Sequence, residues 1–300
     1  LSRAMLTPVL DYASSPRWKW PYSPHDLGCY PKATGQVYGG GERTEDGQMP
    51  VEESGNMIIL IAALSHAEGN CDYAKHYWPM LEKWTAYLKQ FGMDPAHQLC
   101  TDDFAGAFAH NVNLSAKAII ALGAYGWLAE QTGHSKDAKE YQALAKEYAK
   151  QWVQMAADGD HTRLAFDRPD SWSTKYNLVW DKILGLNLFP PKISSDEVKY
   201  YRKISKTYGV PLDSRQRFAK LDWSIWGASL AADRADFQAL LDPVYNFLNH
   251  VPQRNPATDL YWTDSGEEVA MHARPVVGGA FIRMLFDAGI WHEWASKGAK

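Results

Sequence analysis

The sequence has few cysteines, no excess of basic charge and no long uninterrupted apolar run. Cys29, Cys71 and Cys100 are too few and too widely spaced for a zinc cage or a disulfide framework, so at most one bridge could form. The formal net charge of −4 offers no basic stripe to pair with nucleic-acid phosphates. The longest apolar run, 118–129, is too short to span a bilayer. We therefore expect neither a nucleic-acid partner nor a membrane span.

Several well-known catalytic motifs are also missing. The chain has no HExxH zinc motif, no Gly-x-Ser-x-Gly nucleophile elbow, no Walker loop and no dinucleotide-binding fingerprint. Its ten histidines show no metal-ligand spacing. We therefore expect no metal and no cofactor.

Aromatic residues, in contrast, are abundant. The 300-residue chain contains 13 Trp, 16 Tyr and 10 Phe, within an otherwise ordinary globular composition of 46% hydrophobic and 22% charged residues. Such enrichment suits large packed helices and pockets whose walls stack on flat or ring-shaped ligands. Most of these rings are expected in the core.

The apolar positions repeat with a helical period along most of the chain. Segments 72–91 and 136–156 are amphipathic, whereas 57–64, 114–128 and 276–290 are apolar on nearly all sides. A helix that is apolar all round is buried, and an amphipathic one covers it. Because the two kinds alternate and short Gly-, Asp- or Ser-marked turns join them, the pattern predicts helical hairpins with an inner and an outer helix.

Stacked in a ring, such hairpins form an all-α, α/α toroid, and we expect one such domain over residues 1–300. The first helix, 3–12, starts almost at the first residue, which predicts a ring that is incomplete at its N-terminus and belongs to a larger protein. Strands are hard to find in the pattern, and residues 30–48 are glycine-rich and polar, so we expect a long irregular loop there. The helices expected after the first are 54–67, 72–91, 112–131, 136–156, 174–187, 195–207, 222–232, 235–250 and 276–294.

In such a ring the loops that enter the inner helices gather on one face, and these loops carry most of the polar and aromatic side chains. The candidate substrate-binding residues are His25, Asp26, Asn111, Trp172, Arg215, Asp222, Trp223 and Arg274, and the candidate catalytic residues are Glu52, Glu53, Asp102 and Asp103. Capping or ion pairing remains the alternative role for any single carboxylate, and for the arginines an ion pair with a nearby aspartate.

The adjacent pairs Glu52-Glu53 and Asp102-Asp103 are the most suggestive of these. Consecutive side chains on a helix diverge by about 100°, so one member can cap while the other faces a cavity. Crowded carboxylates raise one another's pKa, which lets one site supply a general acid and a general base at neutral pH.

Six motifs in chain order resemble the glutaminase A family of fungi and bacteria, and together they cover nearly the whole chain. They are 24–28 (PHDLG), 49–56 (MPVEESGN), 101–106 (TDDFAG), 184–190 (LGLNLFP), 208–215 (YGVPLDSR) and 273–279 (ARPVVGG). The resemblance implies a C-terminal six-hairpin domain, further domains upstream, secretion or a periplasmic location, and cofactor-free hydrolysis of L-glutamine to glutamate and ammonia. The six-hairpin toroid is also similar to that of six-hairpin glycosidases.

Three functions stay open at this point. An amidohydrolase would hold the α-carboxylate of glutamine with Arg274 or Arg215 and activate water with Asp103 or Glu53, or use a hydroxyl of Thr101 or Ser54 as nucleophile. A glycoside hydrolase would use two carboxylates, with Trp172, Trp223 and Trp262 as stacking platforms. A binding or structural module would have no activity without upstream residues.

Overall fold

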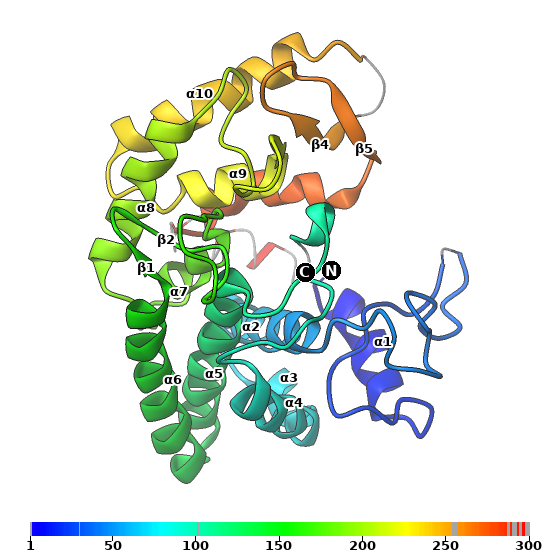
Figure 1. Cartoon of the computed structure of the whole chain (residues 1–300). Coiled ribbons are helices and arrows are strands. Elements are labelled where there is room, and N and C mark those ends of the chain that lie inside the picture. Colours follow the sequence, from blue (N-terminus) through cyan, green and yellow to red (C-terminus); the bar gives the residue numbers. More distant parts are fainter. Residues whose placement is uncertain are drawn as a thin grey trace. The chain divides into compact units, whose positions relative to one another are not determined.

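The computed structural model describes residues 2–29, 31–100, 102–253 and 257–286, with residues 289, 293, 296 and 297 beyond them. The chain divides between Trp152 and Val153 into two compact units, called unit 1 and unit 2 here (Figure 1). The prediction of helices in most of the chain is confirmed in both units.

Unit 1 is helical. Its elements are α1 (Ser2–Ser14), α2 (Pro50–Glu68), α3 (Asp72–His76), α4 (Trp78–Phe91), the 3-10 turn η1 (Asp103–Ala105), α5 (Val112–Thr132) and α6 (Ser135–Ala156), whose last residues lie past the boundary.

The core of unit 1 is the pair α2 and α5, which lie side by side and both contact α4 (Figure 1). Helix α5 begins where the Asn111 side chain accepts a hydrogen bond from the Leu114 amide at 2.9 Å, and it ends at Gly133 with a φ of 84°. Helix α5 is long and apolar enough to cross a membrane, but 94% of its apolar window is buried inside the protein. It is therefore a core helix.

The amphipathic helices of unit 1 bury one side only. Helix α6 buries Ala138, Ala145, Ala149 and Trp152, which share one face, and the Trp152 indole donates to the Val112 carbonyl at 2.8 Å. The predicted alternation of buried and amphipathic helices is thus confirmed in unit 1.

Residues 15–49 form no helix or strand where the structure describes them, and the irregular loop predicted at 30–48 lies within this segment. The buried Gln36 side chain holds this loop, donating to the carbonyls of Tyr38 and Gly41 at 3.4 and 3.3 Å and to the Gln48 side chain at 2.7 Å. The loop is therefore irregular but internally bonded.

Unit 2 mixes short helices with strands. Its elements are β1 (Ala157–Asp158), β2 (His161–Thr162), η2 (Tyr176–Leu178), α7 (Val179–Ile183), α8 (Pro191–Ile204), β3 (Phe218–Lys220), α9 (Leu221–Ala228), α10 (Arg234–His250), β4 (Thr258–Trp262), β5 (Glu268–His272) and the 3-10 helix η3 (Pro275–Phe286).

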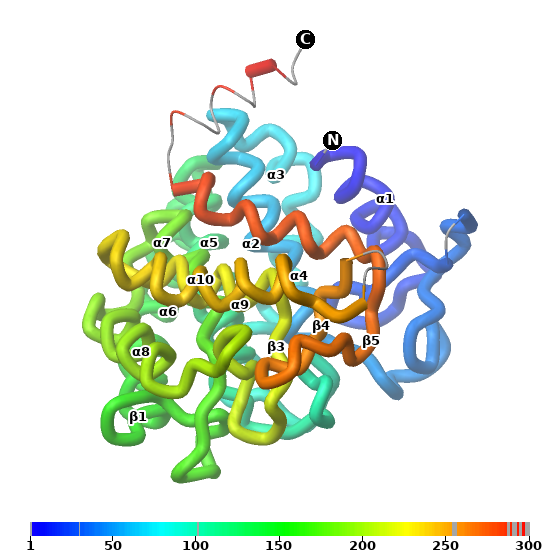
Figure 2. Tube along the Cα trace, turned by 90° about the horizontal axis from the view of Figure 1, so that it is seen from above, coloured from blue at the N-terminus to red at the C-terminus, as the bar shows by residue number. Residues whose placement is uncertain are grey.

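Helix α9 is the centre of unit 2, packed against η3 and α10 (Figure 2). Strand β3 runs directly into α9 and pairs antiparallel with β4, with Phe218 opposite Trp262, and β4 pairs antiparallel with β5. The short strands of unit 2 are thus an addition to the predicted helical fold, in which strands were hard to find from the sequence. Strand β3 is only three residues long and buried throughout, so it shows no alternating pattern in the sequence.

Three predicted helices differ from the observed ones. The helix expected at 72–91 is two helices separated at Tyr77, because Pro79 lacks an N–H and its ring would clash with the preceding turn. The one expected at 174–187 shrinks to η2 and α7, since Gly185 and Asn187 turn the chain with φ values of 63° and 55°. The last predicted helix is 3-10 over 275–286, and most of its remainder lies outside the described residues.

Candidate functional site

Five carboxylates and a lysine gather in unit 1, and we call them the acidic cluster. Its members are Asp26, Glu52, Glu53, Asp102, Asp103 and Lys117. They come from the loop before α2, from the first turn of α2, from the η1 turn and from α5. All four predicted catalytic residues therefore lie in one cluster.

Glu52 is the buried anchor of this cluster. It accepts a short hydrogen bond from the Lys117 ammonium, and both side chains are almost fully buried. Lys117 also donates to the Asn56 side chain at 2.8 Å. A Cβ at position 55 would lie 2.9 Å from Cγ of Lys117, so the glycine at this position leaves room for the lysine side chain beside α2. Glu52 thus serves as an ion-pair partner.

Glu53, its neighbour in sequence, is half-buried. Its Oε2 accepts from the Asn56 amide at 3.2 Å. Burial of its carboxyl among protein atoms, and next the negative charge of Glu52, raise the pKa of Glu53 to about 8. At neutral pH Glu53 therefore holds a proton, as a general acid must.

Asp102 is buried and surrounded by hydrogen-bond donors. The Cys100 thiol donates to its Oδ1 at 2.7 Å, and the amides of Asn111 and Asn113 donate at 3.0 and 3.5 Å. Burial, followed by the charge of Asp102, raises the pKa of the Cys100 thiol well above its usual value. Asp102 is thus a buried hydrogen-bond acceptor whose position is fixed by its donors. The buried Asn111 links it to the start of α5, because the Asn111 side chain also accepts from the Leu114 amide.

Asp103 follows it at the first position of η1 and is half-buried. Its Oδ2 accepts from the Cys100 amide at 3.3 Å. The pKa of the Tyr38 hydroxyl is raised by burial and then by the charges of Asp103 and Glu53. The half-buried members of the two acidic pairs therefore both act electrostatically on Tyr38.

Asp26 organises the loop on which Tyr38 lies. Its carboxylate accepts from the amides of Gly28, Val37 and Tyr38 at 2.7, 2.9 and 3.0 Å. Burial alone would raise the pKa of Asp26, but these hydrogen bonds outweigh it and hold the pKa below its ordinary value. His25 stacks on the Tyr38 ring at 4.1 Å. Asp26 and His25 thus set the position of Tyr38.

A second charged group is buried in unit 2, and we call Lys220, Asp222, Asp259 and Arg274 the balanced network. Lys220 donates to Asp222 at 3.0 Å and to Asp259 at 2.7 Å, while Arg274 binds Asp259 through Nε at 3.0 Å and Nη2 at 2.5 Å. Burial favours the neutral form of Asp259, but the bonds from Arg274 and Lys220 outweigh it and lower its pKa. Burial raises the pKa of Asp222.

Aromatic rings complete this network. Trp223 stacks on Tyr176 with ring centroids 4.5 Å apart, and the Lys220 ammonium lies 4.3 Å from the Trp223 ring. Trp223 is buried, and Arg274 is the most exposed member of the network. The roles predicted for Asp222, Trp223 and Arg274 in binding substrate stay predictions.

Trp172 and Arg215 lie elsewhere in unit 2, on a cavity of about 820 Å³ that Trp262 also lines. Arg215 binds Asp213 through Nε at 3.0 Å and Nη2 at 2.6 Å, and Asp213 is buried. Both predicted carboxylate clamps, Arg274 and Arg215, are thus already engaged with buried aspartates.

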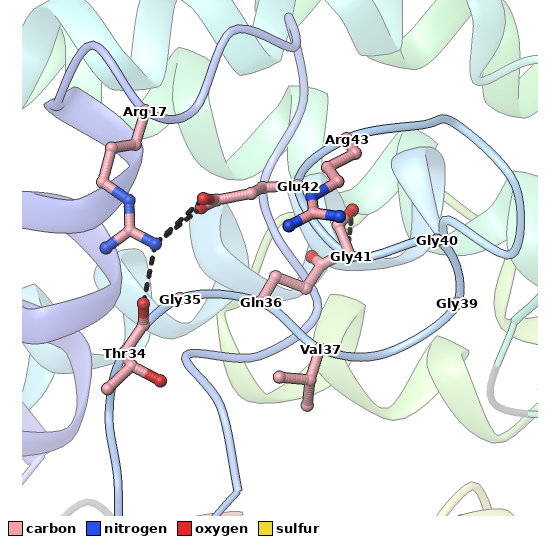
Figure 3. Close-up of a pocket in the computed structure, with 10 residues that line it drawn as sticks. All are labelled: Arg17, Thr34, Gly35, Gln36, Val37, Gly39, Gly40, Gly41, Glu42 and Arg43. Carbon is pink, nitrogen blue, oxygen red and sulfur yellow. Dashed lines mark hydrogen bonds and ion pairs between the residues drawn. The ribbon is translucent and has the colours of Figure 1, made fainter.

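A smaller cavity of about 410 Å³ lies beside the glycine-rich loop of unit 1 (Figure 3). On its wall the Arg17 guanidinium donates to the Thr34 carbonyl at 2.7 Å and to Glu42 at 2.9 and 3.0 Å. No member of the acidic cluster lines it. This cavity is therefore a feature of the loop, separate from the candidate site.

Sequence reasoning missed Asn56, Lys117, Tyr38 and Cys100. Lys117 had a readable signal, since it is the single charge in an otherwise apolar helix segment and so requires an acidic partner. Of the proposed nucleophiles, Thr101 lies outside the described residues, and the buried Ser54 hydroxyl accepts from the Ser23 amide at 3.1 Å. Among the described residues no group of His, Cys, Asp and Glu could hold a metal ion, and all three cysteines are free.

Comparison with known proteins points to one family. The family model described as "Glutaminase A six helical-hairpin domain" matches residues 1–284. Glutaminase A of Aspergillus oryzae is 35% identical over 295 residues, which cover 95% of this chain and 42% of that protein. The chain therefore spans less than half the length of this curated relative.

Solved structures of glycosidases share the fold. A GH78 family rhamnosidase of Bacillus sp. GL1 matches with a TM-score of 0.62 and 14% identity, covering 94% of this chain and 29% of that one. A glycoside hydrolase family 15 glucoamylase from Hypocrea jecorina matches with a TM-score of 0.55 and 13% identity, covering 83% and 53%. At these identities the likeness extends to the fold alone.

Proposed function

The chain belongs to the glutaminase A six helical-hairpin family and has its mainly helical, six-hairpin α/α toroid fold, and from this premise we propose that it hydrolyses L-glutamine to L-glutamate and ammonia at the acidic cluster. The observation that carries the proposal is Glu53, a carboxyl with a pKa raised to about 8 in the acidic cluster, to which the half-buried Asp103 also belongs. Glu53 holds a proton at neutral pH within a group of further carboxyls, and acid–base hydrolysis needs such a proton donor together with a proton acceptor.

In this proposal Asp103 acts as the general base. It takes a proton from a water molecule as the water oxygen attacks the side-chain carboxamide carbon of glutamine. Glu53 then gives its proton to the nitrogen as the carbon–nitrogen bond breaks, and ammonia leaves. The proton held by Asp103 returns to Glu53, so the cycle consumes one water per glutamine and needs no cofactor.

The buried partners keep these two groups in place. Glu52, tied to Lys117, supplies the negative charge that keeps the proton on Glu53. Asp102, held by Cys100 and Asn111, fixes the segment from which Asp103 projects. The excess of carboxylates in the cluster also favours the α-ammonium group of an amino-acid substrate.

A second candidate function is glycoside hydrolysis, in which a pair of carboxyls would flank a glycosidic bond. The specific observation in its favour is the pair of half-buried indoles, Trp172 and Trp262, on one cavity of unit 2. A third candidate function is a binding or structural module without activity. In such a module the raised pKa of Glu53 would have no functional role.

Ammonia release from L-glutamine by the full-length protein tests the proposal, with a panel of aryl glycosides assayed in parallel. We expect ammonia from glutamine and no aryl release. Aryl release without ammonia would replace the proposal by the glycosidase, and no turnover of either kind would favour the inactive module.

We further propose, on the family resemblance, that the protein is secreted or periplasmic and that upstream domains accompany this chain. The length of the Aspergillus oryzae relative, of which the chain covers 42%, is consistent with such domains. Immunodetection in periplasmic, extracellular and cytoplasmic fractions of the native host tests the location, and detection in the cytoplasm alone would contradict it.

A further inference from the structure

Unit 2 contains a cavity of about 820 Å³ that the proposed hydrolysis does not use, and we call it the tryptophan cavity. It is large enough for a ligand of two or three sugar rings, since small-molecule pockets range over about 300–1,000 Å³. The lining residues on which the argument rests are Trp172, Lys203, Lys206, Arg215, Arg217 and Trp262.

Backbone hydrogen bonds place the two indoles on either side of one turn, 213–217. On one side the Ser214 amide donates to the Trp172 carbonyl at 2.9 Å. On the other side Phe218 pairs with Trp262 in the β3–β4 ladder, and the Thr263 amide donates to the Arg217 carbonyl at 2.8 Å. The turn that carries Arg215 and Arg217 is thus fixed between the two tryptophans.

Each indole is also supported by another ring. Trp172 packs edge-on against Tyr200 with centroids 6.1 Å apart, and Trp262 packs against Phe218 at 5.7 Å. Both tryptophans are half-buried, so part of each indole remains accessible. Fixed, accessible aromatic faces bind ring-shaped ligands at a low entropic cost.

The charged groups on the wall are mainly hydrogen-bond donors. Four cations line the cavity, whereas the lining carboxylate of Asp213 is occupied by Arg215. Lys206 makes no ion pair with any residue that the structure describes. Arg217 pairs with Asp264, but that pair is exposed to solvent, and such pairs exchange at little cost. The wall therefore favours a ligand with anionic acceptor groups.

We propose that the tryptophan cavity binds an acidic saccharide, whose rings stack on Trp172 and Trp262 and whose carboxylates accept hydrogen bonds from Lys206 and Arg217. A ring with an apolar face and a carboxylate edge matches both kinds of wall. This binding is independent of the proposed glutamine hydrolysis, because every residue involved lies outside the acidic cluster.

Isothermal titration of the full-length protein with trigalacturonate tests the proposal, with maltotriose as the neutral trisaccharide and AMP as a flat anion that is not an acidic sugar. We expect trigalacturonate to bind at least about tenfold more tightly than either, equivalent to about 1.4 kcal/mol, and to weaken as salt is raised. Failure of trigalacturonate to bind, or equal or tighter binding of maltotriose or AMP, would overturn the proposal.

Substitutions locate the site. Trp172→Ala should lower the affinity for trigalacturonate at least tenfold, and Lys206→Gln should lower it and flatten its salt dependence. Trp20→Ala in unit 1 and Lys192→Gln on the exposed side of α8 are matched controls that should leave it unchanged. Near-ultraviolet circular dichroism verifies folding, and unchanged affinity in a folded Lys206→Gln variant would refute the assignment.

Discussion

The two buried charge groups of this chain differ in how their charges balance. In unit 2, Lys220 and Arg274 face Asp222 and Asp259, and hydrogen bonds from the two cations lower the pKa of Asp259. In unit 1 the acidic cluster has five carboxylates and one lysine, Lys117, which pairs with Glu52, and the pKa of Glu53 rises to about 8.

This difference separates structural from reactive charge. Asp259 accepts hydrogen bonds from two cations, so its pKa is lowered and its ionised form is stable, whereas the pKa of Asp222, which binds Lys220, is still raised by burial. At Glu53 the charge of a neighbouring carboxylate adds to burial, so this carboxyl keeps its proton at neutral pH and becomes available for proton transfer. Substitutions in each of the two groups test this difference.

The largest effect is expected from the half-buried members of the acidic cluster. Asp103→Asn and Glu53→Gln should each lower the turnover number for glutamine by roughly 10²–10⁴-fold, because each removes a proton-transfer group. The melting temperature should change by only a few degrees. Steady-state ammonia release and thermal unfolding check this, and near-full activity in Asp103→Asn would remove Asp103 from the proposed role.

Substitutions in the balanced network should lower the free energy of unfolding. Lys220→Met leaves two buried aspartates without one of their cations, so it should cost about 3–5 kcal/mol in the free energy of unfolding. Lys192→Met, which removes an exposed lysine from a pair with Asp196, is the matched control and should cost less than about 1 kcal/mol. Equal losses in the two variants, measured by urea unfolding, would mean that the network is not structural.

A smaller loss of stability is expected from the buried member of the second acidic pair. Asp102→Asn turns an acceptor into a partial donor facing the Cys100 thiol and the Asn111 amide, which should cost about 1–3 kcal/mol. Asp94→Asn, at an aspartate paired with His110 on the exposed surface, is the control. If Asp102→Asn unfolded at the same urea concentration as its control, the buried acceptor role would be wrong.

The last prediction concerns how stability changes with pH rather than its value at one pH. A carboxyl whose pKa is about 8 when folded and 4.5 when unfolded binds its proton more tightly in the folded state. Its contribution is therefore complete below pH 4.5 and is lost as the pH rises to about 8. Between these values the wild type should lose stability relative to Glu53→Gln in urea titrations, and parallel pH profiles would argue against the raised pKa.

Much of this organisation was predictable because it is local in sequence. The apolar run after Asn111 and the glycine at 133 predict α5 and its ends, and the acidic pairs beside inner helices predict where carboxylates gather. The partner of Glu52 was not predicted, since Lys117 is 65 residues away and only packing of α5 on α2 brings them together. Likewise, the three-residue β3 has no pattern of its own and exists because β4 pairs with it.

The most direct test of this comparison is the pKa of Glu53 itself. Carbon-13 NMR of carboxyl-labelled protein follows the titration, with Glu53→Gln assigning the resonance. Burial of the carboxyl, and next the charge of Glu52, predict a midpoint of about 8. A midpoint near 4.5, the ordinary value for glutamate, would show that Glu53 is ionised at neutral pH and would contradict the proposed division between structural and reactive charge.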